Sequence, residues 1–191
     1  MKVIAVCGSP RKNGNTQILL EKACEILENE GISTELILLA EKEIKPCTAC
    51  TTCKQTKDKT CSIKDDDFHP IFNKILEAEG FIIGSPVYFG CATSQTTSLL
   101  HRVGYVSRNN GNLLSGKVGG PIVVARRAGH NFTYAQLMMF YTINDMIVPG
   151  SSYWNVSLGR AKGDVLSDQE GIDTIEKFAR NLAELMKKLH S

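Results

Sequence analysis

The first strand and the loop that follows it read Val3-Ile4-Ala5-Val6-Cys7 and Gly8-Ser9-Pro10-Arg11-Lys12-Asn13-Gly14-Asn15-Thr16, and they decide the fold. Five consecutive apolar residues are typical of a parallel strand that is covered on both faces. Residues 15–30 then carry apolar side chains at helical spacing, and Gly31 ends that run. The N-terminus therefore predicts a buried strand, a polar loop and an amphipathic helix, which form one βα unit.

The same alternation of strands and helices continues along the chain. Four further segments are expected to contain strands: residues 34–40, 81–84, 117–125 and 147–156. Four further helices are expected at residues 68–79, 94–106, 132–146 and 169–189. This pattern predicts an α/β fold, a three-layer sandwich in which helices cover both faces of a parallel sheet. Five strands fit the flavodoxin-like order 2-1-3-4-5, and we expect a single domain over residues 1–191.

Length and charge narrow the range of functions. The 191 residues include 22 basic and 20 acidic side chains, a net charge of +2. This balance does not favour nucleic acid or an anionic membrane surface as a partner. No apolar run has the length of a membrane span, and the apolar N-terminus is too short for a signal peptide. We therefore expect a cytoplasmic protein that binds neither nucleic acid nor membranes.

Four of the seven cysteines lie in one polar, turn-rich segment, at about residues 41–67, which follows the second strand as an insertion. Their spacing is C-x2-C-x2-C-x7-C, formed by Cys47, Cys50, Cys53 and Cys61. Three closely spaced thiolates can surround one inorganic cluster, and a distant fourth completes the ligand set of a [4Fe–4S] cluster. A zinc site is the alternative, although structural zinc sites usually use two separated C-x2-C pairs. Redox-active or incidental thiols are a third interpretation, and the odd cysteine count argues against disulfides.

The loop after the first strand has the composition of an anion site. In such sheets, ligands bind beyond the carboxyl ends of the strands, and backbone N–H groups at a helix N-terminus attract anions. The loop has neither the ending of a Walker motif nor a G-x-G-x-x-G pattern, so a terminal phosphate, as in flavin mononucleotide (FMN), suits it best. An ordinary capped loop is the alternative. The predicted phosphate-binding residues are Ser9, Arg11, Asn13, Gly14, Asn15 and Thr16.

Two later loops are expected at the same edge of the sheet. Ser85-Pro86-Val87-Tyr88-Phe89-Gly90 follows the third strand and is predicted to line a flavin ring, with backbone N–H groups on the pyrimidine edge. The fourth strand runs into two adjacent arginines, which are expected near FMN or a nicotinamide phosphate. Core aromatics and solvated or subunit-bridging arginines are the alternatives. The predicted cofactor-binding residues in these loops are Pro86, Val87, Tyr88, Phe89, Gly90, Ala125, Arg126, Arg127, Gly129 and His130.

No catalytic side chain is assigned from the sequence. A lone histidine such as His130 is more often structural than catalytic. Cys91, beside the predicted flavin-lining loop, is either a redox thiol or a buried small hydrophobe. The cofactors would carry the chemistry, so an acid–base residue is not required.

Together, the G-S-P-R-x-x-G-N-T loop at residues 8–16, the S-P-V-Y-F-G segment at residues 85–90 and the cysteine motif resemble the iron–sulfur flavoproteins. These belong to the wider NADPH-dependent FMN reductase-like group of flavodoxin-fold proteins. The resemblance implies FMN and one [4Fe–4S] cluster per subunit, with the four cysteines as ligands, in a homodimer or homotetramer. It departs at residues 101–102, where the family often carries an Asp-Arg pair: Arg102 matches and His101 does not.

Three functions compete. The first, implied by the resemblance, is an electron-transfer oxidoreductase that passes electrons from a one-electron donor such as ferredoxin, through the cluster and FMN, to an acceptor. The second is an NAD(P)H-dependent FMN or quinone reductase whose cysteine loop holds zinc or nothing. The third is a sensor or carrier that reports oxygen or iron status. Rapid reduction by ferredoxin favours the first, and rapid reduction by NADPH favours the second.

Overall fold

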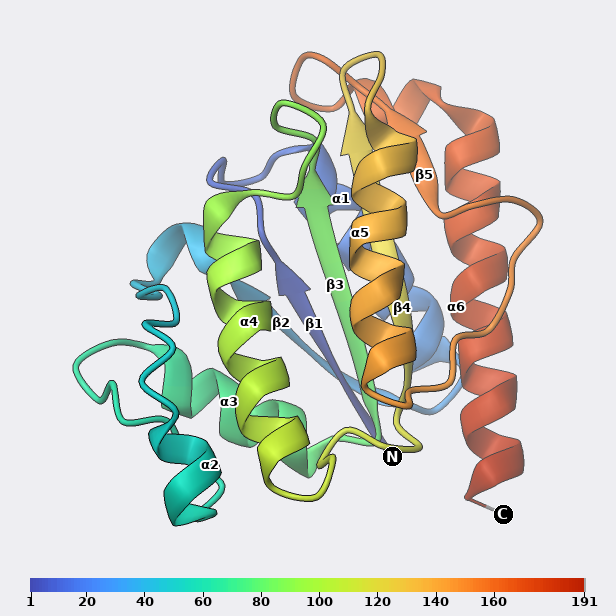
Figure 1. Ribbon diagram of the computed structural model, residues 1–191. Helices are drawn as coiled ribbons and strands as arrows, with labels where there is room; N and C mark the ends of the chain where they lie inside the picture. Colours follow the sequence, from blue (N-terminus) through green and yellow to red (C-terminus); the bar gives the residue numbers. More distant parts are fainter. Residues whose placement is uncertain (191) are drawn as a thin grey trace.

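Figure 1 shows a computed structural model of the chain, which describes residues 1–190. Five strands form one sheet, in which each strand pairs with its neighbours in the parallel direction and the order is β2-β1-β3-β4-β5. This confirms the predicted flavodoxin-like topology. The strands are β1 (Lys2–Cys7), β2 (Ser33–Leu38), β3 (Gly80–Pro86), β4 (Val118–Ala125) and β5 (Val156–Leu158).

Helices cover both faces of the sheet (Figure 1). One face packs against α1 (Asn15–Asn29) and α6 (Gln169–Leu189). The other packs against α3 (Phe68–Glu77), α4 (Ser94–Asn109) and α5 (His130–Ile143). Three short elements complete the chain: η1 (Leu39–Glu41), α2 (Thr52–Thr56) and η2 (Asp164–Ser167).

The apolar run of β1 is explained by these two layers. Val3 and Ala5 belong to the core beneath α1 and α6, whereas Ile4 and Val6 belong to the core beneath α3, α4 and α5. Successive side chains of a strand point to opposite faces, so a strand buried on both faces needs apolar residues at every position. All four of these residues are fully buried.

The fifth strand lies later in the chain than the sequence predicts. We expected it within residues 147–156, but β5 spans Val156–Leu158 and shares only Val156 with that range. Ile147 forms one isolated bridge with Val118, after which Pro149 and Gly150 leave the sheet. Proline lacks the N–H that a ladder needs, and glycine weakens a strand. The carboxyl end of β5 therefore falls at Leu158, and the loop after it joins the edge where ligands bind.

The cysteine-rich segment forms a separate lobe beside α4 (Figure 1). It leaves the sheet after β2 and η1, includes the short helix α2, and returns at α3. The sequence predicts this insertion but not α2. Within residues 1–190, no helix combines the length and the apolar composition that crossing a membrane requires.

Candidate functional site

A pocket of about 480 Å³ opens at the carboxyl ends of the strands. The loops after β1, β3, β4 and β5 form its wall. We call it the basic pocket. Its lining residues are Ser9, Arg11, Lys12, Gly14, Asn15, Thr16, Pro86, Val87, Tyr88, Val124, Arg126, Gly159, Arg160 and Lys162.

The basic pocket carries a strong positive charge. Five lining side chains are cationic, and none of the described residues that line the pocket is acidic. Lys12 forms an ion pair with Glu41 across 2.7 Å, so part of its charge is compensated from outside the pocket. The N-terminus of α1 adds the positive end of its dipole. This combination suits a phosphate dianion. The five cationic residues are Arg11, Lys12, Arg126, Arg160 and Lys162.

The first loop is held in place by contacts to the two neighbouring segments. The Gly8 N–H donates to the Gly84 carbonyl at 2.7 Å, and the Thr93 hydroxyl donates to the Gly8 carbonyl at 2.7 Å. A Cβ at position 8 would lie 1.8 Å from Oγ1 of Thr96, so only glycine fits there. The Ser9 hydroxyl accepts the Arg11 N–H at 3.1 Å, which closes the turn.

Asn15 connects the first loop to the loop after β5. Its side-chain Nδ2 donates to the Ala161 carbonyl at 2.8 Å, and its Oδ1 accepts the Gly163 N–H at 2.7 Å. Both polar atoms of the amide are therefore engaged in holding residues 159–163 over the basic pocket. Asn15, a predicted phosphate-binding residue, lines the basic pocket, and its amide positions a second loop.

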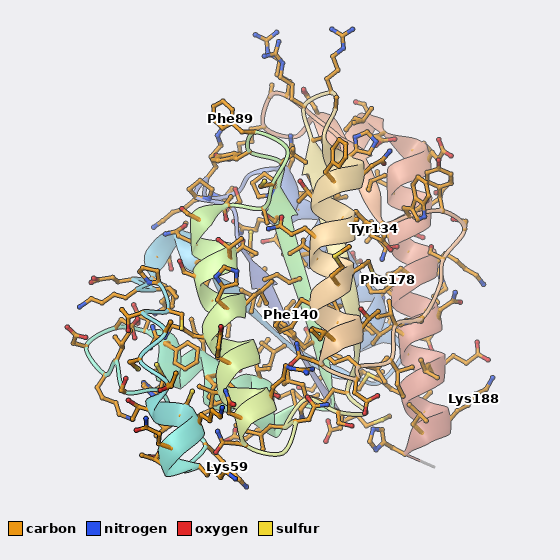
Figure 2. All side chains as sticks on the ribbon, viewed as in Figure 1. Lys59, Phe89, Tyr134, Phe140, Phe178 and Lys188 are labelled. Carbon is orange, nitrogen blue, oxygen red and sulfur yellow. The ribbon has the colours of Figure 1, made fainter. Side chains whose placement is uncertain are left out.

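The loop after β3 forms a tight turn at the rim of the basic pocket. Tyr88 and Cys91 exchange backbone hydrogen bonds of 2.9 and 3.0 Å, and Phe89 and Gly90 between them have φ values of 51° and 81°. Phe89 is fully exposed, and Figure 2 shows it at the tip of the turn. A bulky residue with positive φ is unusual and costs conformational energy. Cys91 is also exposed, so it is not the buried small hydrophobe of the sequence alternative.

The loop after β4 packs against this turn. Gly129 has φ 86°, and a Cβ there would lie 3.0 Å from Cγ1 of Val87 and 3.2 Å from Cα of Gly90. Glycine at position 129 thus permits the close approach of the two loops. His130 begins α5, and its Nδ1 is buried without a hydrogen-bond partner.

The structure brings nine of the sixteen predicted cofactor-binding residues to the basic pocket. Seven others lie in the same loops but do not line it: Asn13, Phe89, Gly90, Ala125, Arg127, Gly129 and His130. Ala125 is buried in β4, and the Asn13 N–H instead donates to Oε1 of Gln17 at 2.6 Å. Arg126 and its neighbour Arg127 are both exposed, but only Arg126 reaches the pocket.

Five lining residues do not follow from the sequence prediction. They are Lys12, Val124, Gly159, Arg160 and Lys162. Lys12 stands inside the predicted loop and Val124 at the end of β4. The other three lie in the loop after β5, and the rule that ligands bind at the carboxyl ends of strands would have found them once β5 was placed correctly.

The four motif cysteines line one small pocket, which we call the cysteine pocket. Its volume is about 20 Å³, and Arg102, Tyr105 and Val106 of α4 form its inner wall. Sγ of Cys50 lies 3.2 Å from the Ser62 hydroxyl, and Sγ of Cys53 lies 4.0 Å from both the Tyr105 carbonyl and Nδ2 of Asn109. Ala49, Thr51, Lys57 and Lys59 all have positive φ, which curls the segment tightly.

Hydrogen bonding and burial affect these thiols differently. Hydrogen bonds from the Ser62 and Thr52 hydroxyls lower the pKa of Cys50 to about 6, so its thiolate predominates at neutral pH. Burial, with the neighbouring cysteines as a second cause, raises the pKa of Cys53. Gathered thiolates repel one another, and a bound cation relieves that repulsion.

The cysteine pocket fits a metal centre in the kind and number of its donors. All four motif cysteines of one segment line this pocket, and four thiolates are the ligand set of both a [4Fe–4S] cluster and a structural zinc ion. However, within residues 1–190 no three His, Cys, Asp or Glu side chains are arranged to ligate a metal. The four thiols therefore have to move when a group binds: closer together around a single zinc ion, or further apart around the larger [4Fe–4S] cluster.

The basic pocket and the cysteine pocket lie toward different ends of α4. Thr93, which caps the N-terminus of α4, contacts the loop of the basic pocket, whereas Arg102 and Tyr105 in its C-terminal half line the cysteine pocket. At 1.5 Å per residue, the distance along the axis from Ser94 to Arg102, the first residue of α4 that lines the cysteine pocket, is about 12 Å.

Comparison with known proteins agrees with this architecture. Residues 1–161 match the family described as NADPH-dependent FMN reductase. An iron–sulfur flavoprotein of Methanocaldococcus jannaschii is 39% identical over 199 residues, which cover 98% of both chains. The chain therefore belongs to the NADPH-dependent FMN reductase family and, within it, to the iron–sulfur flavoproteins. It is a flavin-dependent oxidoreductase, as the sequence predicts.

Solved structures show the same fold. RosB, crystallised with a bound 8-demethyl-8-formylriboflavin-5′-phosphate intermediate, has a TM-score of 0.77 at 19% identity, covering 100% of this chain and 80% of that chain. A flavodoxin from the domain Archaea has a TM-score of 0.64 at 16% identity, covering 98% and 99%. At such low identity these likenesses concern the fold alone.

Proposed function

We propose that this protein holds FMN in the basic pocket and a [4Fe–4S] cluster in the cysteine pocket. It would pass electrons between a one-electron donor such as ferredoxin and an acceptor, in the cytoplasm. The observation that carries this proposal is the gathering of all four motif cysteines around one space, on a lobe separate from the basic pocket.

The residues of the basic pocket suit FMN. The loop of residues 9–16, at the N-terminus of α1, would hold the phosphate, and Arg126 and Arg160 would add charge from two other loops. Pro86, Val87 and Tyr88 would border the ring, because they line the basic pocket from a different loop, the one after β3. Bound FMN supplies the ability to accept one or two electrons. The chain's own part is to bind the phosphate, orient the ring and exclude water.

The position of the cysteine pocket favours an assembly of more than one chain. About 12 Å of helix separates the start of α4 from the cysteine pocket, and electron tunnelling weakens steeply with distance. We therefore propose that electrons cross between cluster and flavin of different chains in a homodimer or homotetramer. The oligomeric state of the loaded protein, measured by light scattering, tests this part: a monomer that still transfers electrons rapidly would contradict it.

An NAD(P)H-dependent FMN or quinone reductase is the second candidate. The observation in its favour is the charge of the basic pocket, because five cations exceed the need of one phosphate dianion. The phosphates of a nicotinamide dinucleotide bound beside FMN would pair with the remaining cationic side chains. In this case the cysteine pocket would hold zinc or no metal.

One preparation separates the two candidates. Protein purified without oxygen is analysed for iron, zinc and acid-labile sulfide per bound flavin. About four irons and four sulfides per FMN support the electron-transfer function. Zinc or no metal, together with rapid bleaching of the flavin by NADPH and slow bleaching by reduced ferredoxin, supports the reductase.

A further inference from the structure

Arg102 is the largest side chain that is fully buried in the described chain, and it lies beside the cysteine pocket. Its guanidinium forms an ion pair with Asp66, and both side chains are completely buried. The guanidinium carbon also sits 4.0 Å from the ring centre of Phe68. A buried arginine is costly unless it is fully paired, so its placement here calls for a reason.

Arg102 ties together the two ends of the cysteine segment. Its Nη1 donates to the Lys45 carbonyl at 3.2 Å, two residues before Cys47. Its Nη2 donates to the Ile63 carbonyl at 3.0 Å, two residues after Cys61. The carboxylate of Asp66 in turn accepts the Lys45 N–H at 2.9 Å, which closes a ring of contacts around the base of the loop.

One nitrogen of the Arg102 guanidinium has no hydrogen-bond partner. Nε of Arg102 is buried and makes no hydrogen bond, and no other residue that lines the cysteine pocket has such an atom. Arg102 lines the same pocket as the four cysteines, and an unsatisfied buried N–H is a donor that a sulfur-rich anionic group bound there can satisfy. Hydrogen bonds to the sulfurs and nearby charge are the factors that set the potential of an iron–sulfur cluster.

We infer that Arg102 is the positioning residue of the cysteine site. It holds the two ends of the segment together through the Lys45 and Ile63 carbonyls. Its positive charge stabilises the reduced cluster, and the negative charge of Asp66 offsets part of that effect. This rests on the proposed cluster; the holding of the loop does not depend on a metal being bound. The electron that reduces the cluster comes from the one-electron donor of the proposed function.

Charge changes within the pair give opposite effects. Asp66→Asn leaves the arginine charge unbalanced, so the reduced cluster gains stability and the potential rises. Arg102→Met leaves the carboxylate instead, so the potential falls. We expect at least a tenfold change in the equilibrium constant of reduction in each direction, which is about 59 mV for one electron. A role in packing alone would not produce shifts of opposite sign.

The same-helix control is Arg108→Met. Arg108 is exposed on α4 and does not line the cysteine pocket, so its loss removes one positive charge without touching the site. The reduction potential of the cluster in the Arg108→Met variant should equal that of the wild type. If Arg102→Met does not fold, the neutral pair Asp66→Asn with Arg102→Met replaces it, because no unpaired charge is then buried. That variant should lose cluster at least tenfold faster than the wild type.

The loop-holding part is tested on metal-free protein. Arg102→Lys keeps the charge but cannot reach two carbonyls and a carboxylate at once. Trypsin should cleave its cysteine segment, at Lys54, Lys57 or Lys59, at least tenfold faster than in metal-free wild type. Equal cleavage rates would overturn the loop-holding role.

The outcomes separate the inference from the proposed function. Wild-type protein without iron would end the cluster proposal, while the trypsin comparison would still decide the role of Arg102. Iron-loaded wild type, with potentials of both pair variants unchanged, would overturn the electrostatic role and leave the proposed function standing. Opposite shifts, with the Arg108→Met potential unmoved, would support the inference.

Discussion

The side-chain Nδ2 of Asn15 donates to the backbone carbonyl of Ala161 at 2.8 Å, which joins the start of α1 to a loop that lies 146 residues away in the chain. That loop carries Arg160 and Lys162 to the basic pocket. One amide thus connects the predicted phosphate loop to two cations that the sequence pattern does not reveal. The shape of the pocket depends on this contact.

Asn15→Ala should weaken FMN binding without unfolding the protein. The substitution removes two hydrogen bonds, each of which contributes about 0.5–1.5 kcal/mol, and it frees residues 159–163. We expect roughly tenfold weaker affinity or more, measured by fluorescence quenching on FMN addition. Asn29→Ala is the matched control, since Asn29 is exposed at the far end of the same helix and does not line the pocket. Equal losses in both variants would contradict a specific role of Asn15.

Arg126 and Arg127 should differ in their effect on FMN, although they are neighbours. Only Arg126 lines the basic pocket. Hydrogen bonds to charged groups contribute about 1.5–3 kcal/mol, so Arg126→Met should raise the dissociation constant roughly tenfold or more, and Arg127→Met should leave it unchanged. Titrations at two salt concentrations should show a weaker salt dependence for Arg126→Met alone. A larger loss for Arg127→Met would contradict the assignment of Arg126 as the arginine that contacts FMN.

Cys50→Ser should remove the proposed metal centre and leave FMN bound. Cys50 lines the cysteine pocket, which shares no lining residue with the basic pocket. We expect less than one third of the wild-type iron per chain and an unchanged FMN content, both measured on anaerobically purified protein. Cys91→Ser is the control, because Cys91 lines neither pocket. Loss of FMN in Cys50→Ser would show that the two sites are coupled.

The Cys50 thiol of metal-free protein should be alkylated rapidly at neutral pH. Hydrogen bonds from Ser62 and Thr52 lower its pKa to about 6, and only the thiolate reacts. The rate of reaction with iodoacetamide, followed by mass spectrometry of the peptide, should rise as the pH increases through about 6 and then level off. Ser62→Ala should move this rise to higher pH. An unmoved profile would exclude the hydrogen bond as the cause.

Asp168 should stabilise the protein in a pH-dependent way. Burial alone would raise the pKa of Asp168, but hydrogen bonds from the Leu158 and Gly171 N–H groups and the Ser157 hydroxyl lower it below its usual range. A lowered folded-state pKa adds stability above the unfolded pKa, about 3.9, which is lost as the pH falls through the folded value. Because Asp168 also caps α6, Asp168→Ala should cost about 1–2 kcal/mol at pH 7.

Urea unfolding at pH 7 and at pH 3 checks this prediction. The difference between wild type and Asp168→Asn should be present at pH 7 and shrink at pH 3, since asparagine keeps the cap but not the charge. A difference that grows at low pH would contradict the assigned direction of the shift.

The strand order followed from local sequence because each βα unit carries its own signal. A double-sided apolar strand such as Val3–Cys7 and a helix with an apolar stripe are recognisable within fewer than thirty residues. Chains of such units join into a parallel sheet by short right-handed connections, so few orders are possible. The carboxyl ends of parallel strands meet at one edge of the sheet, and this rule placed the loops of residues 9–16 and 85–90 at that edge.

The sequence by itself thus determined the fold class, the cysteine motif and the edge of the sheet at which the basic pocket lies. Only the tertiary structure decided where β5 runs, which of two adjacent arginines faces the basic pocket, and that Arg102 lies beneath the cysteine segment. Each of these depends on contacts between residues far apart in the chain, such as Arg102 with Lys45 and Asn15 with Ala161. Local periodicity reports which face of an element is buried, but it carries no record of the partner that covers it.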